Sequence, residues 1–403
     1  MKEKYIVGPR EDKPRSDIRI TFTPSKKSLS FELSSKVDVL FGKSILAQAE
    51  NVCRDLGITS GKILLEDFGA LPFVISARME AVIKAAHTEI TTESLPEMKS
   101  HCQGQSSRNR FRRSRLYIPG NQPKLMLNAG IHKPDGIILD LEDAVAPPEK
   151  ESTRLIVRNA LRTLDFFGAE RMVRINQSEM GLKDLEFLVP HNVHLILVPK
   201  VESGAQLVAV DEKIAEISKK CGRTDPVFLM PIIESGRGVL KALEIAEASP
   251  NNVALAIGLE DYTADMGTKR TQEGRESFFA RSMVVNAARA AGLQAIDSVF
   301  SDLGDEEALR ESVREAKALG FDGKGCIHPR QIQPVNEEFA PSESEIEKAK
   351  RVVLAFDEAE AKGLGVVSLG SKMIDAPVVK KAMQIIDMAI LSKRLSKDWK
   401  KNE

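Results

Sequence analysis

Residues 136–144 read GIILDLEDA, a short apolar run that ends in acidic residues. Its apolar residues run without alternation and lead directly into Asp140, Glu142 and Asp143. An unbroken apolar run of this length is typical of a parallel β-strand that is buried on both faces. Acidic residues at its end are typical of the carboxyl edge of such a sheet, where α/β proteins place their functional groups. The stretch therefore predicts an α/β fold with a site at that edge.

Seven more short apolar runs share this character, and stretches with helical spacing separate them. Helices are predicted at 280–291 and 306–319, each followed by a glycine suited to a C-terminal cap. Eight strand and helix units predict a (β/α)₈ TIM barrel over residues 114–335. A doubly wound open sheet has the same alternation, but no G-x-G-x-x-G opens the first unit. The eight predicted strands are 115–118, 136–141, 172–175, 195–198, 227–233, 253–257, 294–299 and 323–327.

The segments on either side of the barrel have other patterns. Residues 1–90 predict a small α+β domain of order ββαββα, with strands at 17–23, 28–33, 62–66 and 71–76. Residues 91–113 lose this periodicity and predict a solvated basic linker, although its arginines could also bind the phosphate of a nucleotide-bearing thioester. Residues 336–403 predict a helical extension. The arginines of the linker are Arg108, Arg110, Arg112 and Arg113.

Composition limits the class of protein. The 403 residues suit two or three domains, and 58 basic residues balance 58 acidic ones, which disfavours a nucleic-acid partner. The four cysteines form no C-x-x-C pair and predict reduced thiols. No apolar run approaches the ~20 residues that span a bilayer, and no signal peptide is evident, so a cytoplasmic protein is predicted.

Polar residues at the strand ends predict a metal site at one mouth of the barrel. Glu234 and Asp261 follow neighbouring strands and suit Mg²⁺, which prefers oxygen ligands and keeps several waters. A 2-keto acid could chelate the remaining positions, and the metal would stabilise the oxyanion formed when a carbon–carbon bond breaks. Alternatively, each carboxylate could cap the helix that follows it.

Further side chains at this mouth are candidates for substrate binding. Arg174 could hold a substrate carboxylate with its planar fork, or could be engaged in an ion pair with Asp140 or Glu142. Glu142, Asp143 and Lys200 are expected to contact substrate beside it. His328 is left unassigned, because a satisfied core histidine is as good an explanation.

Several motifs resemble one known family over residues 113–390. They are SRLYIPG at 114–120, LDLEDAV at 139–145, VRIN at 173–176, PIIES at 231–235 and GKGCIHP at 323–329. In order and spacing they resemble the citrate lyase beta subunit, within the wider family of malyl-coenzyme A lyases and related aldolases. The resemblance implies a barrel in which Glu234 and Asp261 hold Mg²⁺ and Arg174 contacts the keto acid.

The same resemblance implies a role for the C-terminal segment. Asp375, within GSKMIDAP at 370–377, matches an acid/base aspartate that reaches a neighbouring subunit's site, typically in a trimer. Its role would be proton transfer at the acetyl methyl group. From the residues alone, Asp375 before Pro377 is better explained as a helix N-cap.

The first domain resembles the citrate lyase gamma subunit, a small acyl carrier protein. The matching residues are FG at 41–42, EDFGAL at 66–71 and ARMEA at 77–81. Such a carrier holds its substrate on a coenzyme A-derived arm attached to a serine before the first strand. Here Ser16 stands one place late, and an arginine occupies the expected position. Either Ser16 carries the arm, or the domain serves docking or assembly and the barrel accepts a free coenzyme A thioester.

The predicted activity is Mg²⁺-dependent cleavage of a citryl-type thioester to an acetyl thioester and oxaloacetate. A citramalyl- or malyl-coenzyme A lyase is the rival within the same class. A non-catalytic scaffold subunit is the alternative of another class, and the intact set of site residues disfavours it. A citrate lyase alpha-type acyl transferase would be the expected partner of a carrier-bound substrate.

Overall fold

The computed structural model describes residues 3–10, 14–361, 367–369, 372–374 and 376–402. The chain divides into two compact units, Met1–Ile332 and Gln333–Glu403. The first unit contains the N-terminal domain and the barrel, and the second is C-terminal.

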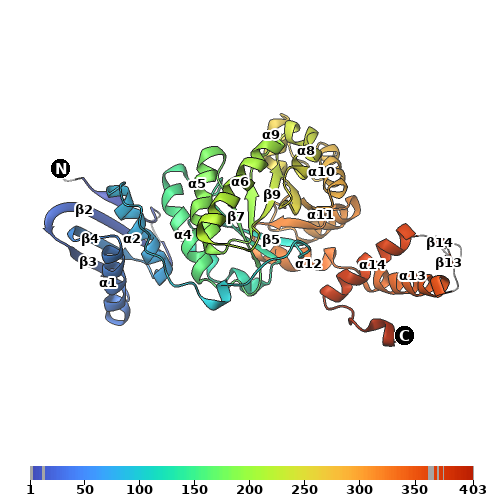
Figure 1. The fold of residues 1–403 in the computed structure, drawn as a ribbon, viewed down its shortest axis with the longest axis horizontal. Coiled ribbons are helices and arrows are strands. Elements are labelled where there is room, and N and C mark those ends of the chain that lie inside the picture. Colours follow the sequence, from blue (N-terminus) through green and yellow to red (C-terminus); the bar gives the residue numbers. More distant parts are fainter. Residues whose placement is uncertain (1–2, 11–13, 362–366, 370–371, 375, 403) are drawn as a thin grey trace. The chain divides into compact units, whose positions relative to one another are not determined.

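Eight parallel strands form a closed barrel, as the sequence predicts (Figure 1). The last strand pairs with the first, which closes the ring. The strands are β5 (Ser114–Pro119), β6 (Gly136–Asp140), β7 (Glu170–Arg174), β8 (Leu195–Val198), β9 (Phe228–Ile233), β10 (Ala254–Ile257), β11 (Gln294–Asp297) and β12 (Gly323–Cys326).

Helices surround the barrel and alternate with its strands. Both caps predicted at Gly292 and Gly320 have positive φ, 69° and 103°, which glycine adopts without strain. The helices are α3 (Pro123–Met126), α4 (Lys150–Thr163), α5 (Ser178–Leu188), α6 (Gly204–Cys221), α7 (Gly236–Leu240), α8 (Ala242–Glu247), α9 (Leu259–Asp265), α10 (Phe278–Ala290) and α11 (Glu306–Leu319).

Apolar side chains fill the inside of the barrel. Ile138, Met172, Leu197 and Met230 belong to one buried cluster, and the Tyr117 ring packs against it. Because side chains alternate along a strand, positions 115, 117 and 119 of β5 share the inward face. The packed interior leaves the carboxyl ends of the strands as the place where a site can form.

The N-terminal domain is α+β, but one predicted strand is wrong. Its sheet has the order β1-β2-β4-β3, in which β3 and β4 are parallel and the other pairs are antiparallel. Residues 72–76 form the start of helix α2, which opens with a proline at its first position, and Leu71 is its N-cap. Residues 73–83 of α2 are all buried, so the helix has no polar face to reveal its period. The elements are β1 (Tyr5–Val7), β2 (Ile18–Ser28), β3 (Ser30–Ser35), α1 (Asp38–Asp55), β4 (Ser60–Asp67) and α2 (Pro72–Ala86).

Helix α2 connects this domain to the barrel through α4. The Asn159 side chain donates a hydrogen bond to the Phe73 carbonyl at 3.0 Å, and Arg162 donates to the Pro96 carbonyl at 2.6 Å. Buried polar groups at a junction must find partners, and these do. The N-terminal domain is therefore packed against the barrel by specific contacts.

The segment 91–113 is not the solvated linker that its composition predicts. Arg112 is 1% exposed and forms a buried ion pair with Glu170 at 2.8 Å. Arg113 pairs with Asp135, while Arg108 and Arg110 donate to backbone carbonyls. Ion pairs and backbone hydrogen bonds have no sequence periodicity, so these contacts could not be recognised from the pattern of residues.

The C-terminal unit is largely helical, as predicted. It contains α13 (Glu343–Ala361), α14 (Ala376–Leu391) and the short antiparallel strands β13 (Val367–Leu369) and β14 (Lys372–Ile374). Val353, Ile386 and Trp399 form part of its buried core. Helix α12 (Ile332–Phe339) lies at the start of this unit. A short 3₁₀ turn, Trp399–Asn402, also belongs to this unit. Short 3₁₀ turns elsewhere in the described chain are Ser100–Cys102, Ala129–His132, Pro147–Glu149, Val189–His191 and Pro329–Gln331.

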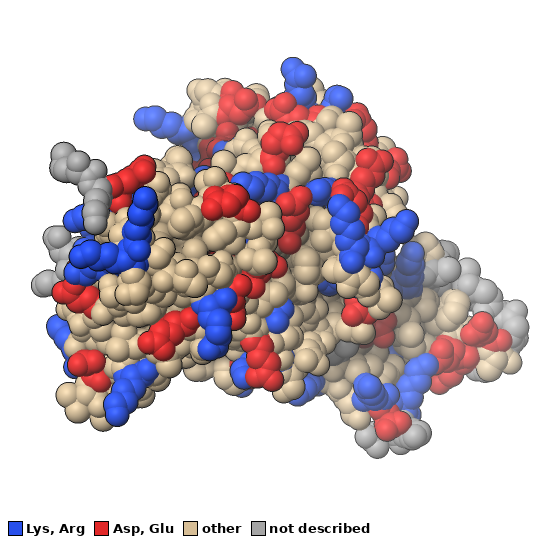
Figure 2. All heavy atoms as spheres, turned by 60° about the vertical axis from the view of Figure 1, so that its left-hand side comes forward, with Lys and Arg blue, Asp and Glu red and all other residues tan. Residues whose placement is uncertain are grey.

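The surface charge is mixed. Figure 2 shows basic and acidic side chains interspersed over the face that it draws, which agrees with the zero net charge. Among the residues that are described, no helix is long and apolar enough to cross a membrane.

Candidate active site

A cavity of about 400 Å³ opens at the carboxyl ends of the barrel strands. Asp143, Arg174, Glu234 and Asp261 line it, so four of the residues singled out from the sequence share one space. They lie at or just after the ends of β6, β7, β9 and β10. These strands follow one another around the barrel, with β8 between β7 and β9. Residues far apart in the chain meet because parallel strands present their carboxyl ends at the same rim.

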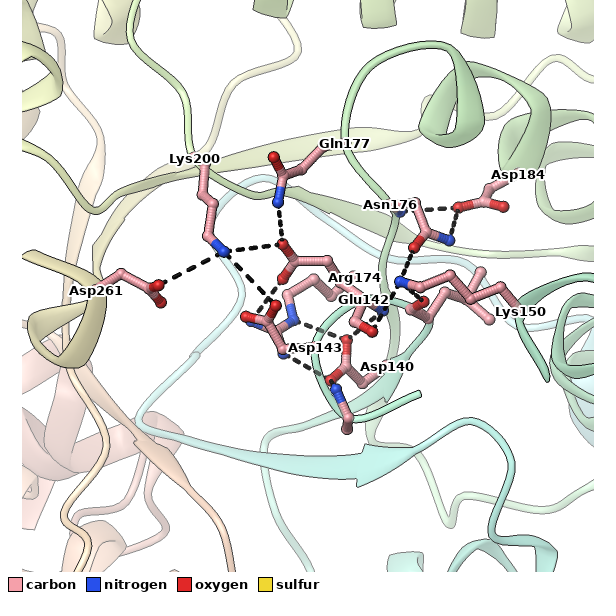
Figure 3. Close-up of polar contacts among 12 residues, drawn as sticks. Asp140, Glu142, Asp143, Lys150, Arg174, Asn176, Gln177, Asp184, Lys200 and Asp261 are labelled. Atoms are coloured by element: carbon pink, nitrogen blue, oxygen red, sulfur yellow. Dashed lines mark hydrogen bonds and ion pairs between the residues drawn. The ribbon is translucent and has the colours of Figure 1, made fainter. Parts of the chain in front are cut away.

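Arg174 is held at the end of β7 by acidic neighbours (Figure 3). Its Nε and Nη2 donate to the two Asp140 oxygens at 2.7 and 2.6 Å, and Nη1 lies 3.0 Å from a Glu142 oxygen. Burial lowers the pKa of Arg174, but these carboxylates outweigh it and raise the pKa further above its usual value. The ion-paired alternative considered from the sequence is thus the arrangement present.

Lys200 connects the two sides of the mouth. Its Nζ lies 3.5 Å from an oxygen of each of Glu142, Asp143 and Asp261, as Figure 3 shows. Burial opposes the lysine charge, yet these carboxylates raise its pKa above the usual value. Asp143 and Asp261 line the cavity, and Lys200 lies between them at its mouth, with Glu142 beside it.

Glu234 is the most strongly perturbed carboxyl group at the mouth. It is 5% exposed, and its Oε1 is buried without a hydrogen-bond partner. Burial, then the hydrogen bond with Asp261 and the charge of that residue, raise its pKa to about 9. A Cβ atom at Gly258 would lie 2.8 Å from the Glu234 Cγ, so glycine is needed to leave room for this side chain.

Two facing carboxylates with an unsatisfied oxygen suit a hard divalent cation. Within the described ranges, no group of three or more His, Cys, Asp or Glu side chains is arranged to hold a metal. Mg²⁺ commonly uses only one or two protein carboxylates and completes its shell with water and substrate. The donor set of Glu234 and Asp261 therefore fits Mg²⁺ and would not suffice for a metal that needs a full protein cage.

The other residues considered from the sequence lie elsewhere. His328 caps a 3₁₀ turn, with its Nδ1 accepting from the Arg330 backbone at 3.1 Å, which is a structural use. Ser16 lies just before β2, with φ 57°, and its backbone donates to the Phe68 carbonyl. Asp375 falls outside the described residues.

Tyr117 and Arg115 are among the cavity-lining residues that the sequence reasoning missed. Tyr117 lies under the Arg174 guanidinium, 5.5 Å from ring centroid to Cζ. Arg115 also lines the cavity and is 1% exposed. The available signal was the position of Arg115 on the same inward face as Tyr117 in β5.

Residues 113–329 match the protein family described as HpcH/HpaI aldolase/citrate lyase. The chain belongs to this family. Its eight-stranded barrel, its motifs and this match agree, and the chain is accordingly a coenzyme A-thioester lyase of the HpcH/HpaI family. Residues 13–86 match a second family, described as malonate decarboxylase delta subunit (MdcD), so an acyl carrier-like domain precedes the HpcH/HpaI barrel.

Relatives within the HpcH/HpaI family carry several activities. The citrate lyase subunit beta of Haemophilus influenzae is 44% identical over 283 residues, covering 70% of this chain and 97% of that protein. The mitochondrial citramalyl-CoA lyase of Mus musculus is 34% identical, covering 69% of this chain and 86% of that protein. The crystal structure of CitE from Mycobacterium tuberculosis with magnesium, acetoacetate and coenzyme A is similar with TM-score 0.58 and 31% identity, covering 70% and 99% of the two chains.

Proposed function

We propose that the barrel cleaves a citryl thioester to an acetyl thioester and oxaloacetate, with Mg²⁺ held by Glu234 and Asp261. The observation that carries the proposal is the buried, unpartnered Glu234 oxygen beside Asp261, in a cavity that Arg174 also lines. The Mycobacterium tuberculosis relative contains magnesium and coenzyme A, which supports the same ligands here. A bound Mg²⁺ would supply electrophilic stabilisation of the developing carbonyl oxygen.

Arg174 would bind the carboxylate of the keto acid. A guanidinium has five N–H donors, and Asp140 accepts from two of them, which leaves three for a substrate. Two of these three are on Nη1, which lies 3.0 Å from a Glu142 oxygen in an ion pair without a hydrogen bond. Because Asp140 fixes the plane of the guanidinium, the free donors are already oriented before substrate arrives. Lys200, Glu142 and Asp143 would keep this arrangement in place and contact the polar end of the substrate.

The acid/base group is proposed to be Asp375, contributed to a neighbouring subunit within a homo-oligomer, most simply a trimer. This proposal rests on the GSKMIDAP motif at 370–377 alone. The aspartate would move a proton to or from the methyl carbon of the acetyl product.

The carrier-like domain would present a tethered substrate if Ser16 carries a coenzyme A-derived arm. A tether raises the effective concentration of the thioester at the barrel. The likeness of residues 13–86 to a carrier family supports this, and an alpha-type acyl transferase would then load the arm. An intact-mass measurement tests attachment, because an unmodified mass excludes the arm.

All four cysteines are free, which supports a cytoplasmic location.

A citramalyl- or malyl-coenzyme A lyase is the second candidate, because the Mus musculus relative is a citramalyl-CoA lyase. The test is turnover of citryl-, citramalyl- and malyl-coenzyme A by the full chain with Mg²⁺, with the keto acid detected by a coupled dehydrogenase. The proposal expects the highest kcat/KM for the citryl thioester. Higher turnover of another thioester would support the second candidate, and no turnover of any would indicate a scaffold subunit.

A further inference from the structure

Arg115 lies deep in the barrel and faces the cavity. It belongs to β5, on the inward face that it shares with Tyr117, and it lines the same cavity as Arg174 and Glu234. Pro119, four residues further along β5, is level with Asp140 at the rim, so the Arg115 backbone lies about 13 Å of strand below it. The Arg115 side chain therefore approaches the cavity from its floor.

No carboxylate neutralises this guanidinium. Its one hydrogen bond to a side chain runs from Nη1 to the Met230 sulfur at 3.1 Å, and its Nε has no partner. Across the described part of the chain, Arg115 forms no ion pair. Arg112, Arg154 and Arg158 are buried to the same degree, and each pairs with a carboxylate at 2.7–2.8 Å.

An unpaired buried charge is costly, so a ligand that neutralises it gains binding energy. Burial lowers the pKa of Arg115 below its usual value, and no nearby carboxylate offsets the effect completely. The guanidinium keeps its charge at neutral pH because the ordinary pKa of an arginine side chain is very high. The floor of the cavity is thus a preformed anion-binding position that the protein itself does not fill.

Glycines on both neighbouring strands leave room for the side chains that pack beside Arg115. In the register of the barrel, Arg115 lies beside Gly136 of β6 and Gly325 of β12. A Cβ atom at Gly325 would lie 2.7 Å from the Val299 Cγ1 and 3.3 Å from the Tyr117 ring. A larger residue at position 325 would therefore displace Val299 or Tyr117, both of which line the cavity with Arg115.

The charges of both arginines that line the cavity, Arg115 and Arg174, act on the Tyr117 phenol. Burial raises the pKa of its phenol, and the charges of Arg115 and Arg174 each act to lower it. Arg174 contacts this ring from the rim side, and Arg115 precedes it by two residues in β5. The cavity thus offers one cation near the mouth and a second at its floor.

We propose that Arg115 binds a second carboxylate of the substrate, so that the site selects a thioester whose keto-acid half is a dicarboxylate. This inference rests on the proposed lyase function. A citryl thioester has one carboxylate on its hydroxyl-bearing carbon and another on the adjacent methylene. A citramalyl thioester has a methyl group in place of that carboxymethyl arm, and a malyl thioester has hydrogen. Only the first uses both arginines.

The test compares Arg115→Met and Arg115→Lys with the unaltered full chain, using citryl- and citramalyl-coenzyme A. A site built to bond a polar substrate group discriminates strongly, and we expect Arg115→Met to lower kcat/KM for the citryl thioester by about 100-fold. The value for the citramalyl thioester should change by less than about threefold. Arg115→Lys, which keeps the charge, should restore part of the citryl activity.

A binding measurement separates this inference from the proposed function. Calorimetry with Mg²⁺ should show that the unaltered chain prefers oxaloacetate to pyruvate and that Arg115→Met abolishes the preference. Arg115→Met should remain folded, because it replaces an unpaired charge by an apolar side chain of similar length beside Met230. If neither keto-acid preference nor the ratio of the two thioester activities changes, Arg115 is not the second anion site. Absence of turnover with an intact oxaloacetate preference would overturn the lyase function and leave the Arg115 site standing.

Discussion

Glu80 and Arg158 form an ion pair at the junction of the carrier-like domain and the barrel, with Oε2 and Nη2 2.7 Å apart and both side chains fully buried. Glu80 belongs to α2 and Arg158 to α4, so the pair joins the carrier-like domain to the barrel. The sequence predicts these as separate domains. Burial raises the pKa of Glu80, but the hydrogen bonds and charges of Arg158 and Lys84 outweigh it and lower the pKa below its usual value.

Removing one partner of this pair should destabilise the protein strongly. We expect Glu80→Gln to lower the free energy of unfolding by about 3 kcal/mol, because Arg158 then stays buried with less compensation. Urea denaturation measures the change. The matched control is Glu32→Gln, which breaks an exposed pair with Lys62 at 2.6 Å and should cost less than about 1 kcal/mol. Equal effects of the two variants would contradict the importance of the junction.

Stability should fall as the pH drops from 7 to 5, because two buried histidines stay neutral in the folded chain. Burial first, then nearby arginines, lower the pKa of His191 to about 3, and burial lowers that of His194 to about 4. In the unfolded chain both would titrate near 6.5, so that state binds more protons below this pH. Each histidine should then lower the free energy of unfolding by about 1.4 kcal/mol for every pH unit below 6.5.

The histidine contribution can be isolated with His194→Gln. Urea denaturation at several pH values between 7 and 5 should give a slope that is shallower in this variant than in the unaltered chain. His194 accepts from the Arg171 backbone and donates to the Gly104 carbonyl, and glutamine can replace part of this bonding without titrating. An identical slope would show that His194 does not govern the acid sensitivity.

Arg174→Lys should impair catalysis more than folding. Lysine keeps the charge but cannot bond both Asp140 oxygens and a substrate carboxylate in one plane, so we expect kcat/KM to fall about 100-fold. Steady-state turnover of the preferred thioester measures the effect. The control is Arg289→Lys, which alters an ion pair on α10 whose arginine is 49% exposed, and should leave turnover unchanged. Turnover at the original rate in Arg174→Lys would exclude a direct role for the Arg174 guanidinium in binding the substrate carboxylate.

The fold was more predictable from the sequence than the contacts of the site. Parallel strands buried on both faces appear as plain apolar runs, so 136–141 and 195–198 could be recognised directly. That same property conceals which residues point inward, and Arg115 was missed for this reason. Residues 71–76 were mistaken for a strand because a helix buried on all sides has no polar period.

Contacts between distant segments had no signal in the sequence. Arg112 looked like a linker residue because its partner Glu170 is 58 positions away. The roles of Arg174 as ion-pair member and as substrate ligand could not be separated, since both use the same donors. Positions after each strand did identify the mouth, because every parallel barrel gathers them there.

Mn²⁺ binding to the full chain tests whether Glu234 and Asp261 hold a metal ion. Titration measures the affinity and the number of ions, and anomalous diffraction from soaked crystals locates them. We expect one ion per chain, bound to Glu234 and Asp261, and loss of this binding in Glu234→Gln. The control Glu247→Gln changes an exposed carboxylate on α8 and should bind as the unaltered chain does. An ion located away from both carboxylates, or unchanged affinity in Glu234→Gln, would rule out a metal site at these two residues.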